Sequence, residues 1–173
     1  AVSGVSLADA ATFQADAKVA SFAVADTAAN LAAGLDTLAG LAKLSAVSVV
    51  GTGGVVASYT WFAAHLATVA LFTSRVLDIH DVPVLQSGAA QANAKVAHFS
   101  VADTAAQIGR YFSTLNARTL LNGITVTDGK PVPLTAAQFT SATFARSLLP
   151  SDTLFAVSGV SLADAATFQA DAK

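Results

Sequence analysis

Four aspartates lie at the ends of short β-like runs of this chain, where carboxylates could bind a cation. They are Asp26, Asp81, Asp103 and Asp128. If the runs stack as neighbouring strands, these carboxylates form a ladder along one sheet edge, and such a ladder could hold calcium through its oxygen atoms. The alternative is capping, because an aspartate oxygen can also accept the free N–H groups of a first helical turn.

The residues around these aspartates favour capping. Asp26 and Asp103 directly precede the sequences TAAN and TAAQ, which begin Ala-rich stretches of helical type. Asp128 precedes Gly129 in a dipeptide typical of turns. Two further pairs have the spacing of a capping box, Thr135 with Gln138 and, more weakly, Ser161 with Asp164. We therefore predict caps and no resident cofactor, with structural calcium as the alternative.

The three histidines are scattered along the chain, at His65, His80 and His98. A metal site needs two or three such side chains that converge with an acid. Nothing in their spacing brings them together, so we predict incidental polar positions and no metal ligands.

Residue patterns of nucleophilic catalysis are absent from the sequence. The chain has no Cys, and none of its serines lies in a G-x-S-x-G motif. The segment GTGG at 51–54 resembles a phosphate loop only faintly, because no G-K-[ST] follows it. A turn between a strand and a helix explains this segment, and we predict that the chain is not an enzyme. An enzyme acting on a polymer would need paired carboxylates that are not bound in caps.

Aromatic side chains could instead bind a ligand, and the candidates are Tyr59, Trp61 and Tyr111. A surface module that binds a polysaccharide or receptor would present them on one exposed face. For Trp61 we favour burial in a helix beside Phe62. The surrounding apolar stretch 55–72 is barely long enough to span a bilayer and contains Ser, Thr and His, so we predict a buried helix there.

Composition points to a protein that packs against copies of itself. Charged residues make up 12% of the 173 residues and apolar residues 54%, so much of the surface is weakly polar or apolar. A net charge of −2 argues against nucleic acid and anionic membranes as partners. The absence of Met suggests a fragment or a processed chain, and it suits a long-lived extracellular material.

Internal repetition organises the whole chain. The eighteen residues 1–18, AVSGVSLADAATFQADAK, recur without change at 156–173. VASFAVADTAANL at 19–31 returns 77 residues later as VAHFSVADTAAQI, and a one-residue insertion later shifts this offset to 78. We divide the chain into 1–18, the end of a preceding repeat, and two repeat units, 19–95 and 96–173. After Lys173 a further unit would begin VASFAVADT again.

Strand-like and helix-like segments alternate within each repeat. The predicted strands are 22–26, 47–51, 77–81, 99–103, 124–128 and 155–159, and the clearest helices are 27–42 and 135–149. Strands joined by short helical connections imply a parallel sheet. We predict an α/β fold, a repetitive βα solenoid similar in architecture to leucine-rich repeats but without their motif; a doubly wound sheet is the alternative.

The segments VADTAANLAAGLDTL, VADTAAQIGRYFSTL, ITVTDG and PLTAAQF resemble repeats of very large secreted bacterial proteins. These are giant surface adhesins and extracellular-matrix proteins, often exported in one step with calcium-binding glycine-rich repeats elsewhere in the chain. The resemblance covers nearly the whole sequence and implies an extracellular or cell-surface location. It carries over no catalytic residue, and the calcium-binding nonapeptide is absent here.

Together these observations predict a structural protein that forms or extends a filament or adhesin stalk. Its partners would be other copies of itself or adjacent repeats of one chain, with no nucleic acid and no membrane insertion. The alternative is a surface binding module for a glycan or receptor. The residues expected to build the stacked core are Phe22, Val24, Leu31, Phe99, Val101, Ile124, Val126 and Phe139.

Overall fold

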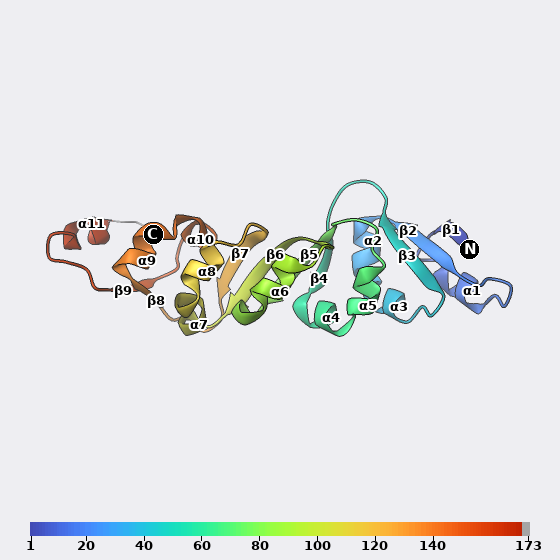
Figure 1. The fold of residues 1–173 in the computed structure, drawn as a ribbon, viewed down its shortest axis with the longest axis horizontal. Helices are drawn as coiled ribbons and strands as arrows, with labels where there is room; N and C mark the ends of the chain where they lie inside the picture. Colours follow the sequence, from blue (N-terminus) through green and yellow to red (C-terminus); the bar gives the residue numbers. More distant parts are fainter. Residues whose placement is uncertain (171–173) are drawn as a thin grey trace. The chain divides into compact units, whose positions relative to one another are not determined.

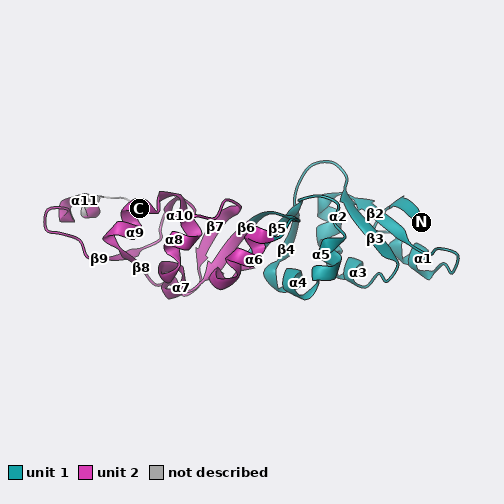
Figure 2. Cartoon of the chain, viewed as in Figure 1, with its two compact units in different colours: residues 1–80, 93–98 teal, residues 81–92, 99–173 magenta. Residues whose placement is uncertain are grey.

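A computed structural model describes residues 1–170 of the chain (Figure 1). The last three residues of the second repeat unit therefore lie outside the described residues. The chain divides into two compact units, residues 1–80 with 93–98 and residues 81–92 with 99–173 (Figure 2). Parallel strands form sheets of three, four and two strands, which confirms the α/β class and the parallel pairing.

The first unit begins with a sheet in the order β1-β2-β3. Its strands are β1 (Val2–Val5), β2 (Phe22–Asp26) and β3 (Leu44–Val49), and the helices α1 (Ala10–Ala15), α2 (Ala28–Ala33) and α3 (Leu35–Ala39) connect them. A second parallel pair follows, β4 (Val55–Ser58) with β5 (Leu77–Val82), joined by α4 (Tyr59–Ala64) and α5 (Leu66–Ala70).

The second unit contains the same kinds of element. It has the 3-10 helix η1 (Val84–Gln86) and helix α6 (Ser87–Ala92). Strand β6 (Val96–Asp103), whose residues from Phe99 onward belong to this unit, pairs in parallel with β7 (Leu121–Val126), and α7 (Ala105–Arg110) and α8 (Phe112–Asn116) connect the two. The pair β8 (Val132–Thr135) and β9 (Phe155–Ser158) is connected by α9 (Ala136–Ser141) and α10 (Thr143–Ser147), and α11 (Ala165–Ala170) follows.

The order of elements repeats with the sequence. Helix α2 and helix α7 lie 77 residues apart and have the same length, and the same offset relates α3 to α8, β3 to β7, β4 to β8, α4 to α9 and α5 to α10. The offset becomes 78 at β9, so the inserted residue lies in the loop between α10 and β9. Loops accept such insertions at little cost.

Strand positions agree with the sequence prediction, with a shift in two of them. β2, β5, β6 and β9 contain or largely cover the predicted runs, whereas β3 and β7 begin three residues before the predicted 47–51 and 124–128. The loop that contains GTGG joins strand β3 to strand β4 and not to a helix, and Gly51 and Gly53 have φ angles of 83° and 118° there. These left-handed angles explain the glycines.

The predicted long helices are wrong. The stretch 27–42 is two helices that meet at Gly34, and 135–149 is two helices that meet at Ala142. The stretch 55–72 begins as strand β4, continues as two helices that meet at His65, and ends at Phe72 in an isolated parallel bridge to Val47. Since the breaks recur at equivalent places whatever residue is present, the packing of the repeat and not a helix-breaking residue sets them.

Hydroxyl caps start these helices. The Thr27 and Ser58 hydroxyls each accept the N–H of the residue three positions later, at 3.2 Å. Thr104 and Thr135 occupy the equivalent positions in the second repeat. The cap at Ser58 explains why a strand gives way to a helix inside one apolar run.

Seven of the eight predicted core residues are buried. The exception is Val126, which is only half-buried because it is the last residue of β7 and pairs with half-buried Asp103. No helix among residues 1–170 is long and apolar enough to cross a membrane.

Candidate functional site

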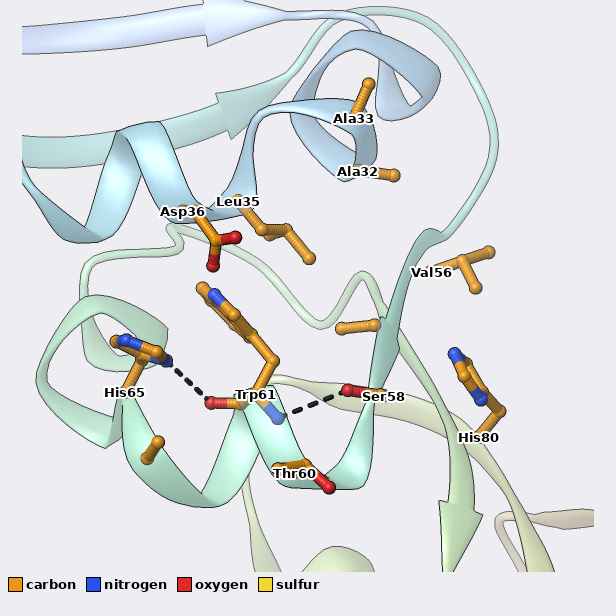
Figure 3. Close-up of a pocket in the computed structure, with 12 residues that line it drawn as sticks. Ala32, Ala33, Leu35, Asp36, Val56, Ser58, Thr60, Trp61, His65 and His80 are labelled. Carbon is orange, nitrogen blue, oxygen red and sulfur yellow. Dashed lines mark hydrogen bonds between the residues drawn. The ribbon is translucent and has the colours of Figure 1, made fainter.

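A pocket of about 560 Å³ opens between helices α2 and α3, strand β4 and helix α4 of the first unit (Figure 3). Its lining contains four side chains that could recognise a ligand through polar or ring contacts: Asp36, Trp61, His65 and His80. No motif spacing joins His65 to His80, yet both lie in this lining. They come from different elements, α4/α5 and β5, which only the fold brings together.

Trp61 is the largest side chain in the pocket. Its side chain is 9% exposed, as expected for a residue buried beside Phe62, and its ring stacks on His65 with centroids 5.0 Å apart. The indole Nε1–H is buried and has no hydrogen-bond partner. Figure 3 shows this nitrogen facing the carboxylate of Asp36. A buried donor without an acceptor costs the folded chain about 1–3 kcal/mol.

A hydrogen bond to the main chain holds the ring of His65. Its Nδ1 lies 2.9 Å from the main-chain oxygen of Trp61. Because a carbonyl oxygen only accepts hydrogen bonds, Nδ1 is the donor in this contact. The pocket lining therefore presents the Asp36 carboxylate as an acceptor beside the Trp61 and His65 rings. A hydroxyl group can donate to that carboxylate while its carbon skeleton packs on the rings.

The second repeat has a smaller pocket at the equivalent place, of about 310 Å³. The framework is retained, since Thr135 replaces Ser58 and Ser158 replaces His80 in its lining. Gln138 stands where the first repeat has Trp61. Its side chain is already engaged within the chain, because Oε1 accepts from the Thr135 N–H at 3.0 Å and Nε2 donates to the Gly109 oxygen at 3.4 Å.

All four of the ligand-recognising residues change between the repeats. Asp36, Trp61, His65 and His80 correspond to Ser113, Gln138, Ala142 and Ser158. This difference was visible in the repeat alignment and was the one sequence signal that could have found the site.

The aspartates at the strand ends bind backbone N–H groups. Asp26 accepts from Leu7 N–H at 2.9 Å, from Thr27 N–H at 2.8 Å and from the Asn30 side chain at 2.7 Å. These bonds, with that from Leu7 the strongest cause, hold the pKa of Asp26 below its usual 3.8. Asp103 repeats the pattern with Val84 N–H at 3.1 Å and Thr104 N–H at 2.8 Å.

The position of the cap differs from the prediction by one residue. Thr27 and Thr104, not the preceding aspartates, are the N-cap residues, and each aspartate joins its cap to a neighbouring segment of the chain. Asp128 accepts from Ala105 N–H at 3.0 Å, which is the main reason that its pKa is lowered. The predicted capping box of Thr135 and Gln138 is present. Ser161 donates to Asp164 at 2.6 Å and accepts from its N–H at 3.3 Å, directly before α11.

Other predicted candidates lie apart from the pocket lining. Asp81 has a positive φ of 59°. His98 is exposed and lies 3.1 Å from the Asp78 carboxylate. Tyr59 packs on Phe62 with ring centroids 6.2 Å apart, and the Arg110 guanidinium lies 5.5 Å from the Tyr111 ring centre. Among the described residues no group of three or more His, Asp or Glu side chains is arranged to hold a metal ion.

Comparison of the chain with family models, with curated proteins and with solved structures finds no match.

Proposed function

We propose that this chain is a structural repeat protein, a repetitive βα solenoid that forms or extends an extracellular or cell-surface filament or adhesin stalk. Its repeats would stack end to end, either within one long chain or between chains. The supporting observation is the different burial of one repeated segment at three places in the molecule.

That segment is residues 1–18, its diverged counterpart at 78–95, and its identical copy at 156–173. Val5 is 5% exposed and its counterpart Val82 is fully buried, whereas Val160 is half-buried. Leu7 is half-buried and Val84 is buried, but Leu162 is 98% exposed. The first two segments are each followed by a strand and helix that cover them. An apolar side chain as large as Leu162 in full contact with water favours association with a covering surface.

The hydrogen bonds between successive elements are also of one repeating kind. Gln14 Oε1 accepts from Lys43 N–H at 3.0 Å, and Gln91 Oε1 accepts from Leu120 N–H at 3.1 Å. Asp26 and Asp103 each bind an N–H group nineteen residues earlier. In a solenoid, stability comes from such nearest-neighbour contacts, so every added repeat supplies the same contacts again.

The test is to append a second copy of residues 19–173 after Lys173. We expect negative-stain electron microscopy to show particles that are longer by a fixed increment and of unchanged width. Hydrogen exchange in residues 156–173 should slow to the rate seen in residues 1–18, because the new unit covers them. A longer chain whose particles only widen, or whose inner segment exchanges as fast as before, would refute the proposal.

A second candidate function is binding of a hydroxyl-rich glycan, and the Trp61 pocket of the first repeat favours it. The indole of Trp61, the single tryptophan, provides the signal for a fluorescence titration with mono- and oligosaccharides. The variants Asp36→Ser and His80→Ser introduce the residues that the second repeat has at these positions. Saturable quenching in the wild type that is lost in both variants supports a glycan site. Equal quenching in these variants and the wild type argues against it.

A further inference from the structure

The surface that holds residues 1–18 is formed by residues 19–43 of the first unit. Strand β1 pairs with β2, Val2 opposite Phe22 and Val5 opposite Val24. The Phe13 and Phe22 rings lie 6.2 Å apart. Polar contacts fix the segment further, from Leu7 N–H to Asp26, from Lys43 N–H to Gln14 and, at 2.7 Å, from the Lys43 ammonium to the Asp16 oxygen.

In the identical segment, the described residues 156–170 are held by the preceding strand and helix. Strand β9 pairs with β8, so that Val157 lies opposite Leu134. The Phe168 ring lies 5.4 Å from Phe139, and the Ser158 hydroxyl donates to the Leu134 oxygen at 3.3 Å. The same eighteen residues thus occur once in contact with the next strand of the chain and once in contact with the preceding strand.

The strand of the segment pairs with the following strand in one copy and with the preceding strand in the other, so one copy can pair on both sides. The same ring, Phe13 or Phe168, lies against a phenylalanine in each case. We propose that the surface of residues 19–43 in one copy of the chain accepts residues 156–173 of a second copy, in place of its own residues 1–18. This inference deepens the proposed function, on which it rests, by naming the binding surface and the occupant. Residues 1–18 then act as a built-in competitor that caps this surface.

The exchange creates no net contact between chains of residues 1–173. Before it, each of the two segments has one face covered; afterwards, the exchanged segment has both faces covered and residues 1–18 have neither. The chain's own segment is tethered next to the surface, which gives it an effective concentration of about the millimolar range. A chain of residues 1–173 is therefore self-capped in dilute solution, and weakening the contacts of residues 1–18 releases assembly.

The identical segments allow a matched test in the full chain. Val5→Asp places a charge in the buried strand of the cap, and Val160→Asp places the same charge in the donor segment. We expect Val5→Asp to lower the dissociation constant of self-association by about a hundredfold relative to wild type, measured by sedimentation velocity over a range of concentrations. Val160→Asp, and the double variant, should remain monomeric.

A synthetic peptide with the sequence of residues 1–18 provides the second measurement. It should bind the Val5→Asp chain with one site by calorimetry and return its oligomers to monomers, while it binds wild type far more weakly. If Val5→Asp is unfolded by circular dichroism, Phe13→Ala takes its place with Phe168→Ala as control, because Phe13 touches Phe22 on the covering side.

The inference is overturned if a folded Val5→Asp or Phe13→Ala chain stays monomeric and does not bind the peptide. It is also overturned if Val160→Asp assembles as well as Val5→Asp. In the appended-repeat experiment, the added unit belongs to the same chain and covers residues 156–173 without any exchange between chains. If that experiment succeeds and the exchange experiment fails, the stacking function stands and only the exchange is wrong. If both fail, the stacking function itself is wrong.

Discussion

Gly109 in helix α7 packs against strand β8 so closely that an added methyl group has no room. A Cβ there would overlap the main-chain oxygen of Pro133 and lie 2.9 Å and 3.0 Å from its ring carbons Cδ and Cγ. Because one of these atoms belongs to the backbone, the helix or the strand has to shift. Gly109→Ala therefore tests how tightly α7 and β8 are packed.

The expected net effect combines two opposing contributions. Overpacking a tight contact costs about 1–3 kcal/mol, whereas replacing glycine by alanine in a helix contributes about 1 kcal/mol of stability. Because the overlapped atom is backbone, the cost lies in the upper part of that range, about 2–3 kcal/mol. We therefore expect Gly109→Ala to lower the free energy of unfolding by about 1–2 kcal/mol, measured by urea denaturation followed by circular dichroism. Trp61 fluorescence reports on the first unit in the same samples.

Gly88 in helix α6 is the matched control. A Cβ at Gly88 would meet only the end of the flexible Arg118 side chain, at 3.3 Å. Gly88→Ala should therefore raise the free energy of unfolding, by up to about 1 kcal/mol. A Gly109→Ala chain as stable as wild type, or stability changes of the same sign in both variants, would contradict tight packing of α7 on β8.

Three further predictions concern the caps and the pocket. Thr135→Ala removes the capping box of α9 and should cost about 1 kcal/mol in urea denaturation, whereas Thr140→Ala, which loses only a hydroxyl bond within the helix, should cost less. The pKa of Asp26 in the folded state lies below 3.8, so its carboxylate stabilises the fold above pH 3.8, and this effect is lost as the pH falls through the folded pKa. The melting temperature of Asp26→Asn should therefore fall less on acidification than that of wild type. An equal fall in both proteins would contradict this role. Trp61→Phe removes the unpartnered Nε1–H but retains a ring, so it should lower the free energy of unfolding by less than about 1.5 kcal/mol. Trp61→Ala should lower it by about 3–5 kcal/mol. Similar losses in both variants would show that the indole nitrogen is stabilising.

Much of the α/β organisation could be predicted from the sequence because it depends on periodic apolar residues. Phe22 and Val24 alternate with weakly polar neighbours, and their equivalents Phe99 and Val101 repeat the pattern. Strand β4 was missed because its four residues form the start of a longer apolar run whose later part is helical. The helix breaks at Gly34 and His65 depend on packing between successive elements, which one segment of sequence does not contain.

The pocket escaped sequence analysis for a related reason. Asp36, His65 and His80 are far apart in the chain and belong to different elements, so no motif spacing joins them. The role of the strand-end aspartates was easier to predict, because a cap is a local interaction. Even there, the long-range bond from Leu7 to Asp26 could not be read from the residues around the aspartate.

The two faces of the duplicated segment also bear on how the length of such a chain can change in evolution. If a copy of residues 19–173 is gained after Lys173, the new junction joins residues 156–173 to a segment beginning VASFAVADT, and the same letters already follow residues 1–18. Unequal recombination within the repeated stretch would thus lengthen or shorten the protein by whole 155-residue units. Every junction that it creates would have a sequence that already occurs, and folds, in the present chain. The length of the protein can therefore change in evolution without a change in the stability of each repeat.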